Sequence, residues 1–367
     1  MAVAFGAREH PLREVFAQLP EAGRWAAFAH VLDYDDLHLP STAHISAVCV
    51  PVAVAGQGED PARAYLAGAG VMARLGTALG WRHYSAGWHA TCTAGAPAAA
   101  VAAALARGLD AEATARAIAL AVPAAGGVQR AFGTAAKSLQ VAFAADAGVR
   151  GAALAEIGAS ADPRALEQWM ALVGGDAAAV DFSGPAVPGG LAIKLFPCCY
   201  ALQRPIAAVM KLAPPPTADA VRRIQVRTTA TSLTPLIHHS PETGLEGKFS
   251  LEYGIAAALL DGSPGFESFS DGAVQRPEAL RLARAVEVTA TDGGDHLLTG
   301  EVEIEIETED GPDVRAVLAL PPGAPDRPPT DDELRAKLEL CAGPDADQLA
   351  ELSFESAAAW LRSRLAG

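Results

Sequence analysis

The chain has 367 residues, half of them hydrophobic but only 6% aromatic, and its formal net charge is −15 with a pI of about 5.0. This length favours two domains or one large domain with an inserted lobe, and the abundance of alanine favours closely packed helices over a β-sandwich. The negative charge argues against nucleic acids and anionic membranes as partners, so an anionic substrate would need a locally basic site.

The N-terminal segment and the cysteines together predict a cytoplasmic protein. Residues 1–20 carry several charges and lack the apolar stretch of a signal peptide, and no apolar run reaches membrane-spanning length. The cysteines form no CxxC pair, and their spacing matches neither zinc nor iron–sulfur sites. Cytoplasmic thiols are therefore the default expectation, and no metal or cofactor is predicted.

The segment from residue 60 to 175 reads as successive helices with short connections, which predicts a helical bundle. Asp110 is a suitable N-cap for one of them, because its carboxylate can accept from the first unpaired N–H groups. The predicted helices cover residues 61–79, 94–107, 111–122, 135–148 with a further helix through 154, and 164–173.

The pattern changes after Asp181, where a Gly- and Pro-rich loop at 183–190 marks a domain boundary. Alternating apolar residues predict strands, the last of which pairs across a turn at Asp310-Gly311. The predicted fold is mainly α: a large helical domain at 1–189, to which 324–367 returns, and a smaller α+β lid domain at 190–323. Strands are predicted at 224–229, 285–290, 301–307 and 314–320, and helices at 205–212, 253–260 and 349–365, with a capping sequence at 330–333.

The segment from His30 to His44 carries three carboxylates and three imidazoles within fifteen residues. Burying so many titratable groups costs free energy unless they pair with one another or bind something. Such clusters are typical of sites of chemistry, and the alternative interpretation is a solvated loop with a few helix caps.

Four further segments place polar residues beside apolar helices. His89 precedes an alanine-rich helix, where the helix dipole opposes protonation of an imidazole. Lys137 falls in the first turn of its helix, the unfavourable end for a cation unless an anion is near. The other two segments contain Lys194 and Tyr253. The whole set suits a small anionic substrate that loses a proton next to a carboxylate.

Lysine is scarce, since only five of the 28 basic residues are lysines. A chain that uses arginine for ordinary surface charge tends to keep lysine where an amine that can lose a proton is useful. A surface charge remains the alternative interpretation for each lysine.

The order of the motifs resembles one known family. In chain order they are HVLDYDDLH followed by His44, RLG at 74–76, GWHAT at 87–91, GTAAK at 133–137, KLFPCCY at 194–200, KFSLEY at 248–253, and a proline-rich segment before Lys337. This order resembles the MmgE/PrpD family, which includes 2-methylcitrate dehydratases, cis-aconitate decarboxylases and iminodisuccinate epimerases. The resemblance extends over about residues 19–340. It implies a helical domain with an α+β lid, catalysis without a cofactor, and a homodimer.

The resemblance also assigns candidate site residues. Leu37 and Cys199 replace a threonine and a histidine of the decarboxylase branch, and Gln203 replaces a histidine common among dehydratase-type relatives. The exchanges at Leu37 and Cys199 argue against decarboxylation of cis-aconitate. The positions that correspond to the catalytic and substrate-binding residues of that branch are Asp33, Leu37, His44, His89, Lys137, Lys194, Cys199 and Tyr253.

The function implied is that of a lyase acting on a small di- or tricarboxylate by proton removal and elimination of water, as in 2-methylcitrate dehydratase. His89 or His44 would be the base, and Tyr253 the acid. Asp33 would orient His44 or hold the leaving hydroxyl. Lys137 would also stabilise the enolate-like charge. The expected substrate-binding residues are Lys137, Lys194, Arg74 and Cys199, although Arg74 could equally hold a helix in place.

Three alternatives stay open. An epimerase would remove and return one proton with the same groups. An inactive relative is suggested by the exchanges at Leu37 and Cys199, and by a start only shortly before the segment at 26–30. A metal-dependent hydrolase could use a divalent site. The residues of such a site would be His30, Asp33, Asp35, Asp36, His38 and His44.

Overall fold

The computed structural model describes residues 1–56, 58–309 and 311–365. The chain forms two compact units. Unit 1 consists of Met1–Arg130, Ala135–Leu191 and Asp331–Gly367, and unit 2 consists of Ala131–Thr134 and Ala192–Thr330. Within the described part of the chain, no helix combines the length and apolarity needed to cross a bilayer.

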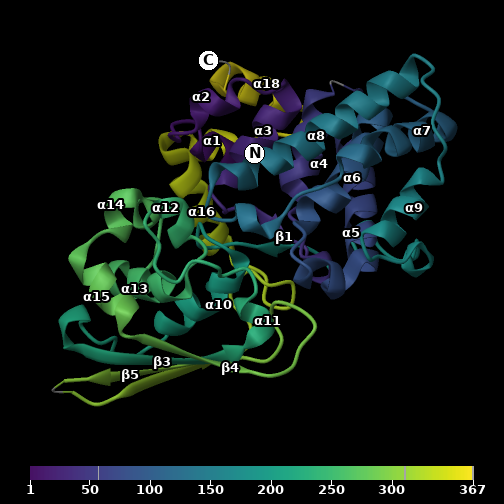
Figure 1. The fold of residues 1–367 in the computed structure, drawn as a ribbon. Coiled ribbons are helices and arrows are strands. Elements are labelled where there is room, and N and C mark those ends of the chain that lie inside the picture. The colour runs from purple at the N-terminus through teal and green to yellow at the C-terminus, as the bar shows by residue number, and fades with distance from the viewer. Residues whose placement is uncertain (57, 310, 366–367) are drawn as a thin grey trace. The chain divides into compact units, whose positions relative to one another are not determined.

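Unit 1 is built from helices, with α6 at the centre of the group (Figure 1). Nearly every residue of α6 is buried, against α4, α5, α7 and α8. Small side chains allow the close approach: a Cβ atom on Gly148 of α8 would lie 2.3 Å from Ala99 Cβ. The elements of this group are α3 (Glu21–Val31), β1 (Asp36–Leu37), α4 (Ile45–Ala55), α5 (Pro61–Ser85), α6 (Ala90–Ala106), α7 (Ala111–Ala121), α8 (Ala135–Glu156) and α9 (Ala165–Leu172).

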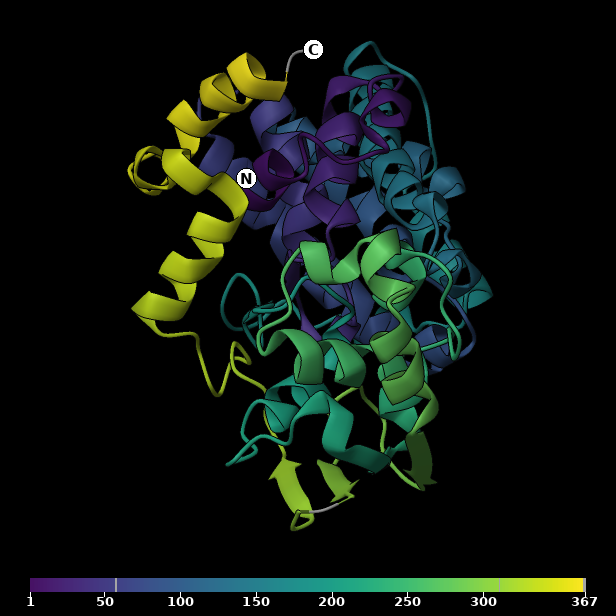
Figure 2. The ribbon, with the colours of Figure 1, turned by 90° about the vertical axis from the view of Figure 1, so that its left-hand side faces the viewer.

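The two ends of the chain meet within unit 1, where the C-terminal helices lie beside the N-terminal ones (Figure 2). The rings of Phe5 and Trp360 are 4.6 Å apart between centroids. Lys337 donates from Nζ to the carbonyl of Tyr34 at 2.6 Å. The helices concerned are α1 (Ala2–Gly6), α2 (Arg13–Phe16), α16 (Asp331–Ala342), α17 (Ala346–Ala350) and α18 (Phe354–Leu365).

Unit 2 contains a mixed sheet with helices against it (Figure 1). The strand order is β4-β3-β5-β6; β3 and β4 are parallel, whereas β5 is antiparallel to β3 and to β6. The parallel pair is connected through the helices between β3 and β4, as parallel strands require. The elements are β2 (Ala192–Ile193), α10 (Tyr200–Val209), β3 (Val221–Thr229), α11 (Ala230–Leu233), α12 (Gly244–Gly247), α13 (Leu251–Asp261), α14 (Asp271–Val274), α15 (Pro277–Arg284), β4 (Val286–Thr291), β5 (Val302–Thr308) and β6 (Val314–Leu318).

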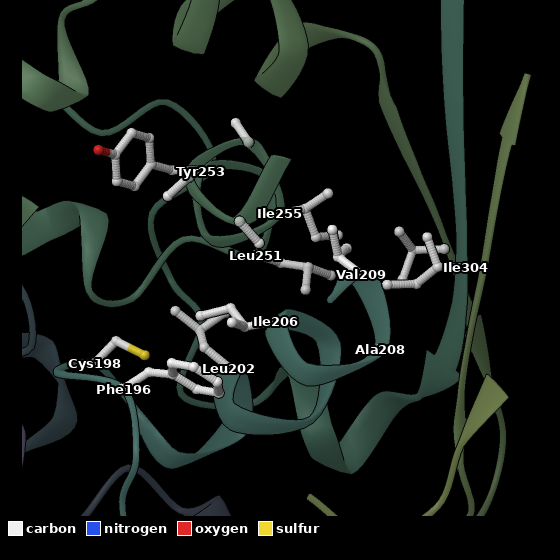
Figure 3. Close-up of a cluster of buried hydrophobic side chains, with 14 of the residues drawn as sticks. Phe196, Cys198, Leu202, Ile206, Ala208, Val209, Leu251, Tyr253, Ile255 and Ile304 are labelled. Carbon is white, nitrogen blue, oxygen red and sulfur yellow. The ribbon is translucent and has the colours of Figure 1, made fainter. Parts of the chain in front are cut away.

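Unit 2 has its own hydrophobic core. Ile206 on α10, Ile255 on α13 and Ile304 on β5 belong to one cluster of buried side chains (Figure 3). On β5 the apolar residues alternate with glutamates, so one face enters this core. Because burial of such side chains is favourable at roughly 25 cal/mol per Å² of apolar area, the core holds α10 against the sheet and α13 against α10.

The predicted elements are confirmed for the most part, with two corrections. The N-cap of α7 is Asp110, which accepts from Ala113 N at 2.8 Å, and β5 and β6 form the predicted antiparallel pair. The turn residue Asp310 lies outside the described residues. The predicted break after Gly148 is wrong, because this glycine serves the contact with α6 and α8 continues. The prediction that a helix starts at Pro205 is also wrong, since α10 starts at Tyr200.

Candidate functional site

The polar segment after α3 forms a buried chain of contacts in unit 1. His30, in the last turn of α3, has Nδ1 2.7 Å from Asp35 Oδ2, and His44 Nδ1 lies 3.0 Å from the same oxygen. Lys137, in the first turn of α8, has Nζ 2.7 Å from Asp33 Oδ1 and 2.7 Å from His30 Nε2. All five side chains are buried. The order of contact is therefore Asp33, Lys137, His30, Asp35 and His44.

The proton positions at His30 follow from Lys137. An ammonium group can only donate, so His30 Nε2 accepts from it. The ring proton of a neutral His30 must then lie on Nδ1, which donates to Asp35. Burial and, next, the nearby Lys137 charge hold the pKa of His30 below its ordinary value, whereas Asp35 and Asp33 act in the opposite direction. His30 is thus a neutral link between a cation and a carboxylate.

His89 joins this group from another element. It is the N-cap of α6, and its ring stacks on that of His30 at 5.8 Å between centroids. Its Nδ1 lies 3.3 Å from Oε1 of Gln140 on α8. Burial is the main cause that holds the pKa of His89 well below its ordinary value, followed by the charge of Lys137. His89 is therefore neutral at physiological pH, as the position before a helix predicts.

The remaining carboxylate and the remaining imidazole of the same segment have structural roles. Asp36 accepts from the backbone N–H and the hydroxyl of Ser46 and so caps the start of α4. His38 contacts Ser41 Oγ at 2.7 Å through Nδ1 and the Pro188 carbonyl at 2.6 Å through Nε2. A carbonyl can only accept, so His38 donates from Nε2. These contacts hold loops in place. The two carboxylates of the contact chain are those of Asp33 and Asp35.

Three of these side chains together could form a metal site by their ligand types. One donor atom from each of His30, Asp35 and His44 lies within 4.8 Å of the others, and two imidazoles with a carboxylate suit several divalent ions. Lys137 argues against a metal here. Because Lys137 donates to His30 Nε2, the proton of the neutral ring lies on Nδ1, which then has no lone pair to offer a metal. The geometry fits a hydrogen-bonded network better than an ion site.

Arg74 lies apart from this group and organises a loop of unit 1. Its guanidinium donates to carbonyls in and just before the predicted boundary loop, among them Asp181 at 2.8 Å and Ala186 at 2.7 Å. Further bonds go to the carbonyls of Gly70, Ser183 and Pro185. The arginine therefore holds this loop against α5, whereas its predicted role in substrate binding stays a prediction.

Two candidate residues of unit 2, Lys194 and Cys199, lie in the segment at 194–200, and the third, Tyr253, lies on α13. Lys194 is fully buried, and Cys199 is the N-cap of α10. Lys248 donates from Nζ to the Pro197 carbonyl at 2.7 Å. Tyr253 on α13 donates from its hydroxyl to the Ser268 carbonyl, and burial raises the pKa of this phenol to about 12.

Gln203 explains how this segment keeps its shape. Its Oε1 accepts from the backbone N–H groups of Leu195 and Phe196, and its Nε2 donates to the Phe196 carbonyl at 2.8 Å. The side chain is fully buried on α10. At this position the amide thus serves the backbone of the loop that follows Lys194.

Lysine scarcity proves informative. Lys137 is 5% exposed, Lys194 is 0% exposed and Lys248 is 4% exposed, whereas lysine is almost never fully buried unless it is paired. Lys211 is exposed. Three of the five lysines therefore occupy costly positions, which supports the interpretation that they are kept for their chemistry.

Within unit 1 the structure brings together four predicted site residues, Asp33, His44, His89 and Lys137. Sequence reasoning missed Gln140, although it follows Lys137 by three positions on a helix and so shares its face. It also gave His30 and Asp35 a role only as ligands of the alternative metal site. The predicted residues Lys194, Cys199 and Tyr253 belong to unit 2.

A mainly helical fold that buries histidines, carboxylates and a lysine in one contact group defines a protein equipped for acid–base chemistry. The model of the MmgE/PrpD N-terminal domain matches residues 22–176, and that of the MmgE/PrpD C-terminal domain matches residues 196–360. The chain belongs to the MmgE/PrpD family.

Curated relatives agree with this assignment. The chain is 26% identical to a cis-aconitate decarboxylase of Aspergillus terreus (strain NIH 2624 / FGSC A1156) over 366 residues, which cover 88% of this chain and 74% of the relative. It is 27% identical over 353 residues to the cis-aconitate decarboxylase-like protein oryM of Aspergillus oryzae (strain ATCC 42149 / RIB 40), covering 85% and 73%. Family and relatives together support a lyase-type enzyme.

Proposed function

We propose that the chain is a lyase that removes a proton next to a carboxylate of a small di- or tricarboxylate, with elimination of water as the leading reaction. The observation that carries the proposal is that the buried ring of His89 stacks on His30, and that Nε2 of His30 accepts from Lys137. This arrangement combines a base that stays neutral with a cation able to stabilise enolate-like charge. Relatives named for a reaction of cis-aconitate support a tricarboxylate as the substrate class.

The base in this proposal is His89. Its lowered pKa keeps the imidazole unprotonated, so it can accept a proton without first losing one. Lys137 has a second effect: its charge disfavours the imidazolium before substrate binds, and it attracts the negative charge that develops on the substrate. His44 and Asp33 would complete this group, with Asp33 balancing the Lys137 charge.

Lys194, Cys199 and Tyr253 stay proposed as substrate-binding or catalytic residues on the strength of the family resemblance. A raised pKa means that Tyr253 keeps its proton at physiological pH, as a general acid must. Lys194 would provide a second ammonium for a carboxylate. We also keep the expectation of a homodimer as part of the proposal.

Three reactions of this family would use the same imidazole and the same cation. Elimination and epimerisation both begin with removal of a proton from carbon, whereas decarboxylation forms a similar carbanion by loss of carbon dioxide and then takes up a proton. Product analysis therefore separates them: an unsaturated acid indicates elimination, a deuterated acid of inverted configuration indicates epimerisation, and release of carbon dioxide indicates decarboxylation.

The test is a proton-exchange screen in heavy water over small di- and tricarboxylates, including 2-methylcitrate and cis-aconitate. We expect deuterium incorporation with at least one of them in the presence of EDTA, since no metal is part of the proposed chemistry. His89→Gln should lower the rate by about 10²- to 10⁴-fold, the usual contribution of a general base.

A matched control is His83→Gln. His83 is also buried in unit 1, but its ring contacts the Val173 carbonyl and the Thr93 hydroxyl outside the contact group. This variant should keep the exchange rate of the folded protein. Full activity of His89→Gln, or no exchange with any acid of the panel, would contradict the proposal.

A further inference from the structure

Gln140 lies on α8, three residues after Lys137, and faces His89. Its Oε1 accepts from the backbone N–H of Val128 at 3.1 Å and lies 3.3 Å from His89 Nδ1. A backbone N–H can only donate, so the atom that it contacts must be the amide oxygen, and this fixes the orientation of the amide. The atom that faces His89 Nδ1 is therefore an acceptor.

An acceptor at this place determines where His89 carries its proton. A neutral imidazole has one N–H and one nitrogen with a lone pair. Because Gln140 Oε1 accepts, Nδ1 is the N–H and Nε2 carries the lone pair. Cys92 Sγ, 3.2 Å from the same Nδ1, is compatible with this, since a thiol can accept as well as donate. Burial raises the pKa of the Cys92 thiol, so it stays protonated.

The backbone around His89 is held independently of the ring. The N–H of His89 donates to the Gly127 carbonyl at 2.9 Å, and the Gln129 amide donates to the Trp88 carbonyl at 3.0 Å. Gly127 has a φ of +147°, and a Cβ atom there would lie 2.9 Å from Gln140 Oε1. The amide and the loop that precedes α6 are thus closely packed, which restricts both the ring and its partner.

We propose that Gln140 is a positioning residue that fixes His89 in the tautomer with its proton on Nδ1, so that Nε2 is the atom that takes the proton from the substrate. This inference rests on the proposed function, because it assigns an atom to the base named there. It also gives a reason for an amide at position 140. The hydrogen bond from an uncharged acceptor raises the pKa of His89 less than burial and the Lys137 charge lower it, so the tautomer is set while the imidazolium, which cannot accept a proton, stays disfavoured.

The test measures the tautomer directly, by ¹⁵N NMR of protein labelled at its nine histidines. Protonated and lone-pair ring nitrogens resonate far apart, and a His89→Asn sample identifies the signals of His89. We expect the wild type to carry the proton on Nδ1. Gln140→Met removes the acceptor at similar side-chain length; it should shift the population toward the Nε2–H tautomer and lower kcat about 10- to 100-fold with little change in KM.

Gln140→Glu provides the conservative variant. A carboxylate still accepts from Nδ1, so the tautomer should be retained. The added negative charge stabilises the imidazolium, and the acidic limb of the kcat/KM profile should therefore move to higher pH. A merely structural role of Gln140 would predict neither the retained tautomer nor the shifted limb.

The matched control is Gln129→Met, which removes amide hydrogen bonds from the neighbouring loop without touching the imidazole. It should leave the His89 tautomer unchanged. A wild-type His89 with its proton on Nε2, or a Gln140→Met variant with an unchanged tautomer, would overturn the inference. If Gln140→Met does not fold, the wild-type spectrum and Gln140→Glu decide. The tautomer is measured without substrate, so its outcome is separate from that of the exchange screen.

Discussion

Lys137 lies in the first turn of α8, where the helix dipole disfavours a cation. Asp33 compensates from 2.7 Å and adopts a left-handed φ of 51°, which aspartate tolerates better than most residues. The unfavourable end of the helix could be predicted from the sequence. The partner could not, because Asp33 is 104 residues away along the chain and only the packing of α3 against α8 brings the two together.

At the residue scale, Asp146 on α8 should make stability depend on pH. Burial, only partly opposed by the hydrogen bond from Gly23 N and by Arg150, raises the pKa of this carboxyl from 3.8 to about 6. The folded state thus binds a proton more tightly than the unfolded state. The resulting stabilisation is complete below about pH 4 and is lost as the pH rises through about 6.

Asp146→Asn should therefore stabilise the protein at neutral pH, because the amide oxygen can still accept from Gly23 without carrying a charge. If the carboxyl were fully buried, this pKa shift would lower the free energy of unfolding at neutral pH by up to about 3 kcal/mol. Since the side chain is partly exposed, we expect about 1 kcal/mol.

Urea unfolding at about pH 7.5 and toward pH 4 measures this effect. The gain should shrink as the pH falls. Asp60→Asn makes the same exchange at an exposed N-cap that also accepts from a backbone N–H, and as the matched control it should give no gain in stability. Equal stability of wild type and Asp146→Asn at neutral pH would show that the ionised carboxyl costs nothing here.

At the element scale, the sequence predicted those helix ends and strands that depend on interactions between residues close together along the chain. The cap of α7 at Asp110 and the alternation of β5 depend on residues close together in sequence, and both are confirmed. The break predicted after Gly148 failed because the same residue type can end a helix or allow a close helix contact. Gly148 allows a close helix contact because Ala99 on α6 packs against it, and the sequence alone does not show that these two residues meet.

Gly80 is a glycine needed for its backbone conformation. It lies within α5 at φ 66° and ψ −173°, a conformation that only glycine adopts easily, and so kinks the helix where the sequence predicted its end. A Cβ atom there would meet nothing within 4 Å. Space alone would therefore tolerate alanine, but the backbone would not.

Gly80→Ala should lower the free energy of unfolding by about 1–3 kcal/mol through backbone strain alone. The control is Gly272→Ala in α14, which also has open space but an ordinary helical backbone, and which should be neutral or stabilising by up to about 1 kcal/mol. Urea unfolding of the two variants separates strain from crowding. A Gly80→Ala protein as stable as the wild type would mean that the kink can form with other backbone angles.

At the scale of the whole molecule, the division into two units was predictable only in outline. The composition change after Asp181 indicated where strands begin, but nothing in the sequence marks the four residues Ala131–Thr134 as part of unit 2. They belong to it because Phe132 stacks on Phe249, 5.1 Å apart between centroids, and its carbonyl accepts from His238 Nε2 at 2.8 Å. Contacts of this kind between distant segments are what composition and periodicity cannot supply.

If the units have separate cores, core truncations should act locally. Phe132→Ala removes a ring that is 4% exposed in unit 2, and Phe16→Ala removes a fully buried ring in unit 1 that packs edge-on against Phe28. Each should cost about 3–5 kcal/mol of local stability. Amide hydrogen exchange followed by mass spectrometry should report reduced protection in β3 and α13 for Phe132→Ala and in α3 for Phe16→Ala. Each variant is the control for the other. Equal loss of protection throughout the chain in both would mean that the two units unfold as a single cooperative structure.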